Sequence, residues 1–252
     1  MTEPAARSPE ERLSTIRALV VDRGTVRIET LAAEFGVSEM TVRRDLDALE
    51  ALGLARRVRG GAVALGPERW ERRHQHNARA KAKMADKLRP LVPDTGTVAF
   101  DASTTIHRLA ASLSAARDLV VVTNGWDTFQ ALQDKAGVTA CLTGGVREPK
   151  TDSLVGPIAT RAARSYIYDV FFSSAAALDA EFGTSEATLA ESEVKRAIAE
   201  VCGRVVLVVD SSKLGTRAQA RVLDLEQVDV LVTDLHQSDH RLDPYRGVAE
   251  IV

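Results

Sequence analysis

The sequence has few aromatic residues, few cysteines and no long apolar run. Aromatic residues make up 4% of the 252 residues, and the two cysteines, Cys141 and Cys202, are far apart. They match no zinc-ligand or redox spacing, so we predict neither a disulfide framework nor a metal site from them. No stretch approaches the ~20 apolar residues that cross a bilayer, and the N-terminal residues lack an apolar signal segment. We therefore expect a cytoplasmic protein without a membrane partner.

The chain as a whole has almost no net charge, but residues 40–83 are strongly basic. Its net charge of −2 argues against non-specific binding of nucleic acid by the whole surface. Between residues 40 and 83, nine arginines and two lysines stand against five acidic residues, which gives this stretch a net charge of +6. A local basic patch on an acidic protein suits a polyanionic partner. A solvated, arginine-rich linker is the alternative that charge leaves open.

Three helices are expected in the first fifty residues. Ser8 can cap the first helix, with Pro9 at its first position and Glu11 completing a capping box. This helix is expected to end near residues 23–24, and a short second helix to begin at Thr30.

Ser38 is expected to cap the third helix. Apolar residues recur in it at helical spacing, which places Arg43 and Arg44 on the outer face. That is where the recognition helix of a helix-turn-helix meets base edges and phosphates.

A basic hairpin is predicted after the third helix. Residues 54–59 have the pattern of a strand with three arginines, and Gly60 and Gly61 can form the two-residue turn into a second strand at 62–64. Such a wing would follow the DNA backbone or enter the minor groove. A three-helix module that binds protein, with arginines for solubility, is the less favoured alternative.

Residues 37–46, VSEMTVRRDL, with 49–50 and 53–54, resemble the helix-turn-helix signature of the DeoR family, and residues 57–62, RVRGGA, resemble its wing. The resemblance implies a transcriptional regulator that binds operator DNA. It assigns base and backbone contacts near the third helix and phosphate contacts to the wing. The DNA-binding residues by this match are Ser38, Thr41, Arg43, Arg44, Arg57 and Arg59.

Residues 66–83 are charged and poor in aliphatic side chains, so we interpret them as a linker between a DNA-binding domain at 8–65 and a second domain at 84–252. His74 and His76 lie in this stretch without a third ligand nearby. A hinge helix near DNA therefore explains them better than a metal site. We predict no metal and no cofactor.

From residue 97 onward, short apolar runs alternate with helical segments, which is typical of an α/β domain. Continuous apolar runs fit strands that are buried on both faces of a mostly parallel sheet. Polar residues follow the runs, at the carboxyl ends where open α/β sheets bind ligands. The expected strands are 98–100, 119–122, 138–142, 170–172, 205–209 and 230–232.

Residues 101–105, DASTT, lead from a strand into a helix, so their hydroxyl and N–H groups could hold a phosphate. Simple capping of the helix is the alternative. Lys213 follows another strand and could supply a cation to the phosphate. Lys195 lies on a helix whose charges could instead form a solvated face.

The DeoR resemblance extends through this domain, at residues 101–105, 121–124, 144–145, 191–195 and 210–213. It implies a phosphorylated-sugar effector and a fold similar to ribose-5-phosphate isomerase and coenzyme A transferases. We expect the phosphate near Thr104, Thr105 and Lys213, and sugar hydroxyls at Asp101. The effector-binding residues by this match are Asp101, Ser103, Thr104, Thr105, Thr123, Asn124, Gly144, Lys195 and Lys213.

Residues 173–177, SSAAA, depart from the family pattern, in which many members have a polar or charged residue and a glycine. This departure weakens the main alternative, an aldose-ketose sugar-phosphate isomerase with an accessory DNA-binding module, although Asp179 and Glu181 are nearby acids that could serve as acid and base. A DNA-binding protein whose second domain only oligomerises is a third interpretation.

We expect a repressor of a carbohydrate operon rather than an enzyme, released from DNA by a phosphorylated sugar. Two-fold operators require an even oligomer, so a homo-oligomer, dimer or tetramer, is expected.

Overall fold

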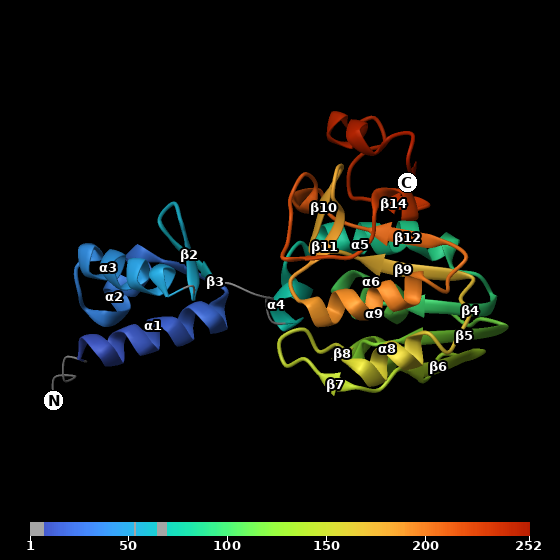
Figure 1. The fold of residues 1–252 in the computed structure, drawn as a ribbon, viewed down its shortest axis with the longest axis horizontal. Coiled ribbons are helices and arrows are strands. Elements are labelled where there is room, and N and C mark those ends of the chain that lie inside the picture. Colours follow the sequence, from blue (N-terminus) through green and yellow to red (C-terminus); the bar gives the residue numbers. More distant parts are fainter. Residues whose placement is uncertain (1–7, 53, 65–69) are drawn as a thin grey trace. The chain divides into compact units, whose positions relative to one another are not determined.

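The structure is a computed structural model that describes residues 8–52, 54–64 and 70–252. The chain divides between residues 69 and 70 into two units, each with its own core (Figure 1). Within the described ranges, no helix is both long and apolar enough to cross a membrane.

The described part of the smaller unit contains three helices and an antiparallel sheet with strand order β1-β3-β2. Ile16, Leu31 and Leu46, one from each helix, are fully buried in its core. The elements are α1 (Pro9–Arg23), β1 (Thr25–Arg27), α2 (Ile28–Phe35), α3 (Glu39–Ala51), β2 (Ala55–Val58) and β3 (Gly61–Ala64).

The capping signals of the first and third helices are confirmed. Ser8 and Glu11 form the predicted capping box of α1, and the Ser38 hydroxyl accepts from the N–H of Thr41 at the start of α3. The second helix begins at Ile28, two residues before the predicted Thr30. Ile28 is 1% exposed, so packing against the core places the start of this helix although no side chain caps it.

The hairpin turn lies one residue earlier than predicted. Val58 pairs with Gly61, so the turn is formed by Arg59 and Gly60, and Gly61 begins β3. A Cβ atom at position 61 would lie 1.9 Å from the main-chain oxygen of Val26. Gly61 is therefore required by the close approach of β1, a strand that the sequence pattern did not indicate.

Seven strands of the described chain form one sheet in the larger unit, with order β15-β14-β12-β9-β4-β5-β6 and every pairing parallel. All six predicted strands are present, which confirms the α/β class; the short edge strand β15 was not predicted. The strands are β4 (Thr95–Phe100), β5 (Asp118–Thr123), β6 (Val138–Leu142), β9 (Val170–Ser174), β12 (Val205–Val208), β14 (Val230–Val232) and β15 (Glu250–Ile251).

Helices cover both faces of this sheet (Figure 1). Side chains alternate along β4, so Val98 and Phe100 pack with three helices on one face, while Ala99 packs with two helices on the other. The first group is α5 (Ala78–Leu88), α6 (Thr104–Ser112) and α7 (Trp126–Leu132), and the second is α8 (Pro157–Ala163) and α9 (Leu189–Ala199).

Part of the stretch that we interpreted as a linker is helical in the larger unit. Helix α4 (Trp70–Gln75) and the first half of α5 lie in residues 70–83, and residues 66–69 are outside the described residues. Lys81, Met84 and Leu88 share the buried face of α5. Because Lys81 replaces an apolar residue on that face, the apolar stripe begins too late to be recognised in residues 66–83.

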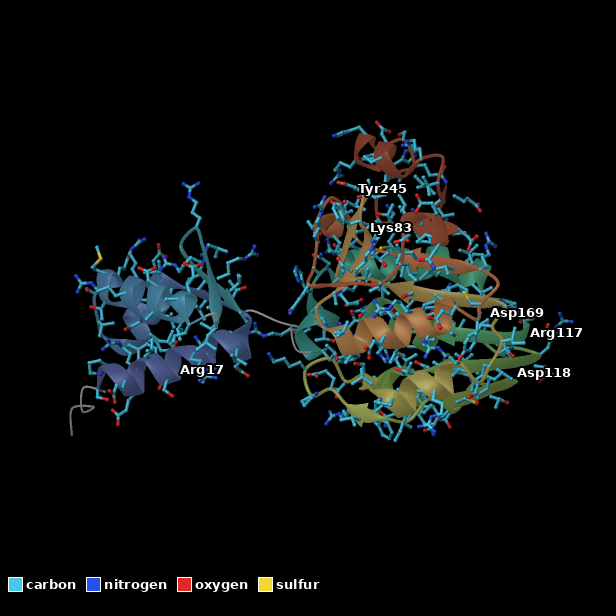
Figure 2. The ribbon with its side chains drawn as sticks, viewed as in Figure 1. Arg17, Lys83, Arg117, Asp118, Asp169 and Tyr245 are labelled. Atoms are coloured by element: carbon cyan, nitrogen blue, oxygen red, sulfur yellow. The ribbon has the colours of Figure 1, made fainter. Side chains whose placement is uncertain are left out.

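The two ends of the parallel sheet differ in character. At the amino ends, Figure 2 shows Arg117, Asp118 and Asp169 close to solvent, and the Asp169 carboxylate accepts from the N–H of Thr97 at 2.8 Å. The carboxyl ends are followed by buried polar residues. Shorter strands outside the main sheet are β7 (Val146–Arg147), β8 (Leu154–Val155), β10 (Ala177–Asp179), β11 (Gly183–Glu186) and β13 (Ala220–Arg221).

Candidate functional site

Helix α3 presents a polar outer face, as its apolar spacing predicts. Arg43 and Arg44 are exposed, while Val42 and Leu46 are completely buried. Arg43 lies 3.3 Å from the carboxylate of Glu39, a weak exposed pair one turn away. Among the described residues, Arg44 has no recorded ion-pair or hydrogen-bond partner, so its guanidinium is available to a ligand. Ser38 and Thr41 are joined by their hydroxyl groups, whose oxygen atoms are 2.9 Å apart.

The wing is held against α3 by Arg57. Its guanidinium donates to the main-chain oxygen of Arg43 at 3.1 Å and lies 2.6 Å from the carboxylate of Asp47. A further bond reaches the main-chain oxygen of Gly61 at 3.1 Å. These bonds use Nε and Nη1 of Arg57, so the side chain has a structural role in the wing, and its contact with DNA phosphate stays a prediction. Arg59, at the turn, is exposed.

A buried ion pair that the sequence did not indicate joins α1 to α3. The guanidinium of Arg12 contacts both carboxylate oxygens of Asp45, at 2.7 and 3.2 Å. Asp45 is 9% exposed, so this bidentate contact fixes the angle between the two helices in a partly desolvated setting.

In the larger unit, Asp101 follows β4 and is 0% exposed. One oxygen accepts from the N–H of Ser103 at 2.9 Å, and the other accepts from Ser173 Oγ and Ser174 N–H at 3.0 and 2.7 Å. Burial favours the neutral acid, but the Lys195 ammonium 2.9 Å away and these bonds outweigh it and hold the pKa of Asp101 below its usual range. Because Asp101 is completely buried and four donors already hold its carboxylate, this geometry favours a structural role over the expected contact with sugar hydroxyls.

The ammonium group of Lys195 also forms all of its bonds within the protein. Its ammonium contacts Asp101, the main-chain oxygen of Ser174 at 2.7 Å and the carboxylate of Glu186 at 2.5 Å. Burial opposes its charge, but the two carboxylates outweigh burial and raise its pKa above the ordinary value. An ammonium has three donors, and all three are used here. Lys195 therefore organises the site and has no donor left for a ligand.

The hydroxyl residues after β4 lie at the start of α6. Ser103 caps the helix through a bond from the N–H of Ile106 at 3.3 Å, so the capping interpretation of this residue is correct. Thr104 and Thr105 are 4% and 3% exposed. The hydroxyl of Thr104 donates to the main-chain oxygen of Arg73 in α4 at 3.4 Å.

The predicted residues after β5 and β6 lie along the same edge of the sheet. Thr123 pairs with Phe100, so Asn124 stands next to Asp101 in register. Thr123 accepts from the N–H of Gly125 at 3.0 Å. Asn124 is only 2% exposed, and its buried side-chain oxygen has no hydrogen-bond partner. Gly144 has a φ of 68°, which favours glycine, and a Cβ atom at this position would lie 3.9 Å from the side chain of Ile158.

Lys213, in a 3-10 turn at Ser211–Lys213 after β12, points toward the segment that follows β9. Its ammonium donates to the main-chain oxygen of Ala175 at 2.6 Å and lies 3.5 Å from the hydroxyl of Ser174. Burial lowers the pKa of Lys213 despite the nearby carboxylate of Asp210.

Three further cations belong to this region and were missed in the sequence. Lys81 of α5 lies within electrostatic reach of Lys213, of Arg73 in α4 and of Arg108 in α6. Lys81 is 5% exposed and donates to the main-chain oxygen of Arg73. Burial, followed by the charges of Lys213, Arg73 and Arg108, lowers the pKa of Lys81 to about 8. The spacing of Lys81 from Met84 and Leu88 is the one sequence signal for its inward orientation.

Two donors in this cluster of cations are unused. The Nε atoms of Arg73 and Arg108 are buried and have no hydrogen-bond partner. Buried donors almost always have a partner, so unsatisfied guanidinium N–H groups beside a lysine indicate a place for an anion. Asp210, which accepts from Asn77 at 3.2 Å, is an acid that faces Lys81.

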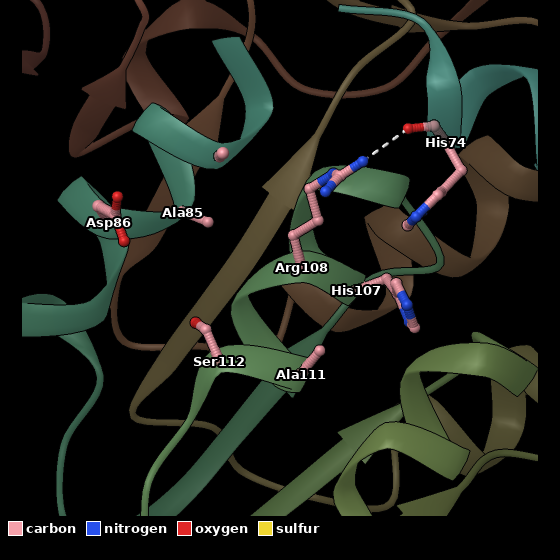
Figure 3. A pocket seen from close by; sticks show the side chains of 8 residues that line it. His74, Ala85, Asp86, His107, Arg108, Ala111 and Ser112 are labelled. Carbon is pink, nitrogen blue, oxygen red and sulfur yellow. Dashed lines mark hydrogen bonds between the residues drawn. The ribbon is translucent and has the colours of Figure 1, made fainter. Parts of the chain in front are cut away.

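A pocket of about 460 Å³ lies between α5 and α6, beside this cluster (Figure 3). His74, His107 and Arg108 line it, and Arg108 donates to the main-chain oxygen of His74 at 2.8 Å. Burial lowers the pKa of both histidines. Among the described residues, no group of three or more His, Cys, Asp or Glu side chains could hold a metal ion.

The acids that an isomerase would need are occupied elsewhere. Asp179 and Glu181 both contact Arg217, at 2.9 and 3.4 Å. The bond from Arg217 lowers the pKa of Asp179, which makes this carboxylate a weaker base.

Family models match most of the chain. The DeoR-like helix-turn-helix domain matches residues 12–68, and the DeoR C-terminal sensor domain matches residues 76–235. A solved structure with partial similarity is ribose 5-phosphate isomerase A from Neisseria gonorrhoeae, at 16% identity and a TM-score of 0.36; the match spans 53% of this chain and 52% of that one.

Curated relatives align over nearly the whole chain. The lactose phosphotransferase system repressor of Streptococcus mutans is 32% identical over 96% of this chain and 98% of its own length. The regulator GlpR of Haloferax volcanii is 34% identical over 90% of each chain. The glycerol-3-phosphate regulon repressor of Escherichia coli is 29% identical over 89% of this chain and 90% of its own. These relatives are regulators and not enzymes, and the chain itself belongs to the DeoR family of transcriptional regulators.

Proposed function

We propose that this protein represses a carbohydrate-metabolism operon and that a phosphorylated sugar relieves the repression. Relatives named as repressors of lactose phosphotransferase and glycerol-3-phosphate genes support the class of pathway. An effector that binds the DNA-free form more tightly would shift the population away from operator DNA. Such a regulator works in the cytoplasm, where the operator lies.

The observation that carries the effector proposal is the cluster of Arg73, Lys81, Arg108 and Lys213 at the carboxyl edge of the sheet, with two buried guanidinium N–H groups unused. A phosphate dianion would satisfy these donors. The start of α6 adds main-chain N–H groups and the positive end of a helix dipole. In this proposal the direct ligands include Thr104, and Asp101 and Lys195 hold the loop in place.

The sugar part of the effector would extend from the phosphate along the edge of the sheet. The unpartnered oxygen of Asn124 is suited to accept a bond from a sugar hydroxyl. Gly144 lies two residues after the end of β6, on the same edge of the sheet. Besides Arg73, Lys81 and Arg108, the residues proposed to contact the ligand are Ser103, Thr104, Thr105, Asn124, Gly144 and Lys213. Thr123 accepts a bond from Gly125 and so shapes the turn that holds Asn124.

For DNA, we propose that Ser38, Thr41, Arg43 and Arg44 of α3 read the operator and that Arg59 contacts phosphates from the wing. A two-fold operator needs two copies of α3 about one helical turn of DNA apart, so we propose a homodimer or a tetramer of dimers.

The test is fluorescence anisotropy of the full-length protein on labelled DNA from upstream of its own and neighbouring genes, with and without a panel of sugar phosphates. The matched controls are the same sugars without phosphate. Salt-sensitive binding that one sugar phosphate weakens, and its parent sugar does not, supports the proposal. Operator binding that no sugar phosphate changes would contradict the effector half, and the absence of binding to any of these DNA segments would contradict the repressor half.

A further inference from the structure

The last carbonyl groups of α4 are bound by side chains of the proposed phosphate site. Helix α4 ends at Gln75 and the chain turns at Asn77, whose φ is 53°, so the final carbonyls of α4 lack helical partners. The main-chain oxygen of Arg73 accepts from Lys81 and from Thr104 at 3.4 Å. The next carbonyl, that of His74, accepts from Arg108 at 2.8 Å (Figure 3). Two cations and a hydroxyl thus hold the end of α4.

Lys81 is the donor that should attract an anion most strongly. It is 5% exposed, and its partner in the structure is a neutral carbonyl group. Lys213, Arg73 and Arg108 face it with like charge, and Asp210 faces it with opposite charge. The position therefore has more positive than negative charge, and a carbonyl dipole compensates it only in part.

A phosphate has the advantage over the Arg73 carbonyl in competition for these donors. Hydrogen bonds between ionised partners are roughly twice as strong as bonds between neutral ones. Carbonyl groups at the end of a helix can bind water in place of a side chain. The Thr104 hydroxyl has one proton to donate, so it cannot bind both the Arg73 carbonyl and a phosphate oxygen. The Lys81 ammonium has three donors, and a phosphate that draws the ammonium toward itself would weaken the bond to the carbonyl.

We propose that Lys81 and Thr104 bind the effector phosphate in place of the Arg73 carbonyl, so that the effector releases one of the contacts that hold the end of α4. The bonds from Arg108 to His74 and from Arg73 to Thr151 remain and become its main anchors. The inference rests on the proposed function because it uses the same site. Helix α4 is the first helix of the larger unit after the DNA-binding unit in the sequence. Loss of the contact at the Arg73 carbonyl would change the tether from which the DNA-binding unit extends, which links the phosphate to the operator.

A purely structural role is the competing explanation. Basic side chains often cap the carboxyl ends of helices, and Lys81 and Arg108 could do no more than this. The two explanations differ in one observable respect: a capping role predicts that α4 stays in place when phosphate is present.

Trp70 reports on α4 directly. Its ring stacks on His74 with the ring centres 4.8 Å apart and meets the edge of His107 at 5.2 Å. The chain has two tryptophans, so Trp126→Phe leaves Trp70 as the single fluorophore. Trp126 is 43% exposed and is not part of the proposed site.

The experiment titrates the full-length Trp126→Phe protein with inorganic phosphate, against chloride at equal ionic strength, while Trp70 emission and calorimetric heat are recorded. We expect saturable binding with a shift in Trp70 emission. Adding Lys81→Met should weaken phosphate binding by at least about tenfold and abolish the shift at concentrations that saturate the parent. Lys83→Met is the matched control on the same helix, because Lys83 is exposed and contacts the main-chain oxygen of Asp234 instead.

Calorimetric binding without a change at Trp70 would overturn the displacement, and equal affinity in Lys81→Met would overturn the role of Lys81. A lack of phosphate binding would also overturn the inference. The parent titration is decisive even if Lys81→Met does not fold. Operator binding and its response to sugar phosphates, measured by anisotropy on the same preparation, test the proposed function separately.

Discussion

The guanidinium of Arg57 lies 3.1 Å from the main-chain oxygen of Arg43, so a side chain of the wing is bound to the recognition helix. The two arginines near the turn of the hairpin therefore point in different directions. Arg57 is directed inward to α3, whereas Arg59 is exposed at the turn.

Arg57→Ala should therefore affect the stability of the fold, and Arg59→Ala should affect DNA binding. Arg57→Ala removes bonds to Arg43, Asp47 and Gly61. We expect it to lower the free energy of unfolding by about 1–2 kcal/mol, measured by urea denaturation of the full chain. Arg59→Ala should leave stability unchanged and reduce the slope of log K against log salt by about 1 in DNA-binding titrations. The reverse pattern would show that the assignment of the two residues is wrong.

Arg44→Ala tests the recognition helix. Its side chain is exposed, and among the described residues it has no recorded partner, so its removal should leave the fold intact and cost roughly 1–3 kcal/mol of operator affinity. Arg17→Ala on α1 is the control, because Arg17 is also an exposed arginine of the same unit (Figure 2). Anisotropy titrations on one operator fragment measure both. Equal affinity of Arg44→Ala and the unmodified protein would contradict the assignment.

Lys195→Met should destabilise the larger unit strongly. The substitution leaves the buried carboxylates of Asp101 and Glu186 without their shared cation. Removing one partner of a buried pair costs about 3–5 kcal/mol, and chemical denaturation would measure this loss. Because the two side chains act together, Asp101→Asn combined with Lys195→Met should cost less than the sum of the single variants. Additive losses would argue against the coupling.

Phosphate affinity should fall as the pH rises above about 8. Lys81 has its pKa lowered to about 8 by burial and by the cations Lys213, Arg73 and Arg108, with Asp210 opposing them. Below this value the ammonium is charged and can bind phosphate; above it the free protein loses the proton, so binding must restore it. Phosphate itself is mostly the dianion over pH 8–9.5, because its second ionisation lies below this range, at about 6 for phosphate esters. Calorimetry across this range measures the decline, and Lys81→Met should show a flatter profile.

Much of the fold could be predicted from the sequence because its signals are local. Apolar runs such as 119–122 and 230–232 need no distant partner to be recognised as buried strands. The hairpin register could not be predicted, because it depends on how closely Gly61 approaches Val26, two residues that are far apart in the sequence. β15 was missed because two residues carry almost no periodic signal.

The same distinction between local and distant signals applies to the residues of the candidate site. The loop at 101–105 was recognised because its residues are consecutive, whereas Arg73 and Lys81 belong to the site only through the packing of α4 and α5. The bonds to Asp101 could not be predicted for a related reason. Its partners Ser173, Ser174 and Lys195 come from other elements, and nothing near Asp101 in the sequence shows that they occupy its oxygens.

The bonds that hold Asp101 also affect how strongly the protein can respond to its effector. A loop that is fixed by a buried carboxylate has already lost its conformational freedom when the chain folds, so a ligand does not have to restrict it again. Little of the interaction energy of a small metabolite is then spent on ordering its receptor, and more of it remains for moving α4. Preorganisation at one side of the site thus allows a ligand with few atoms to shift an equilibrium at the other side.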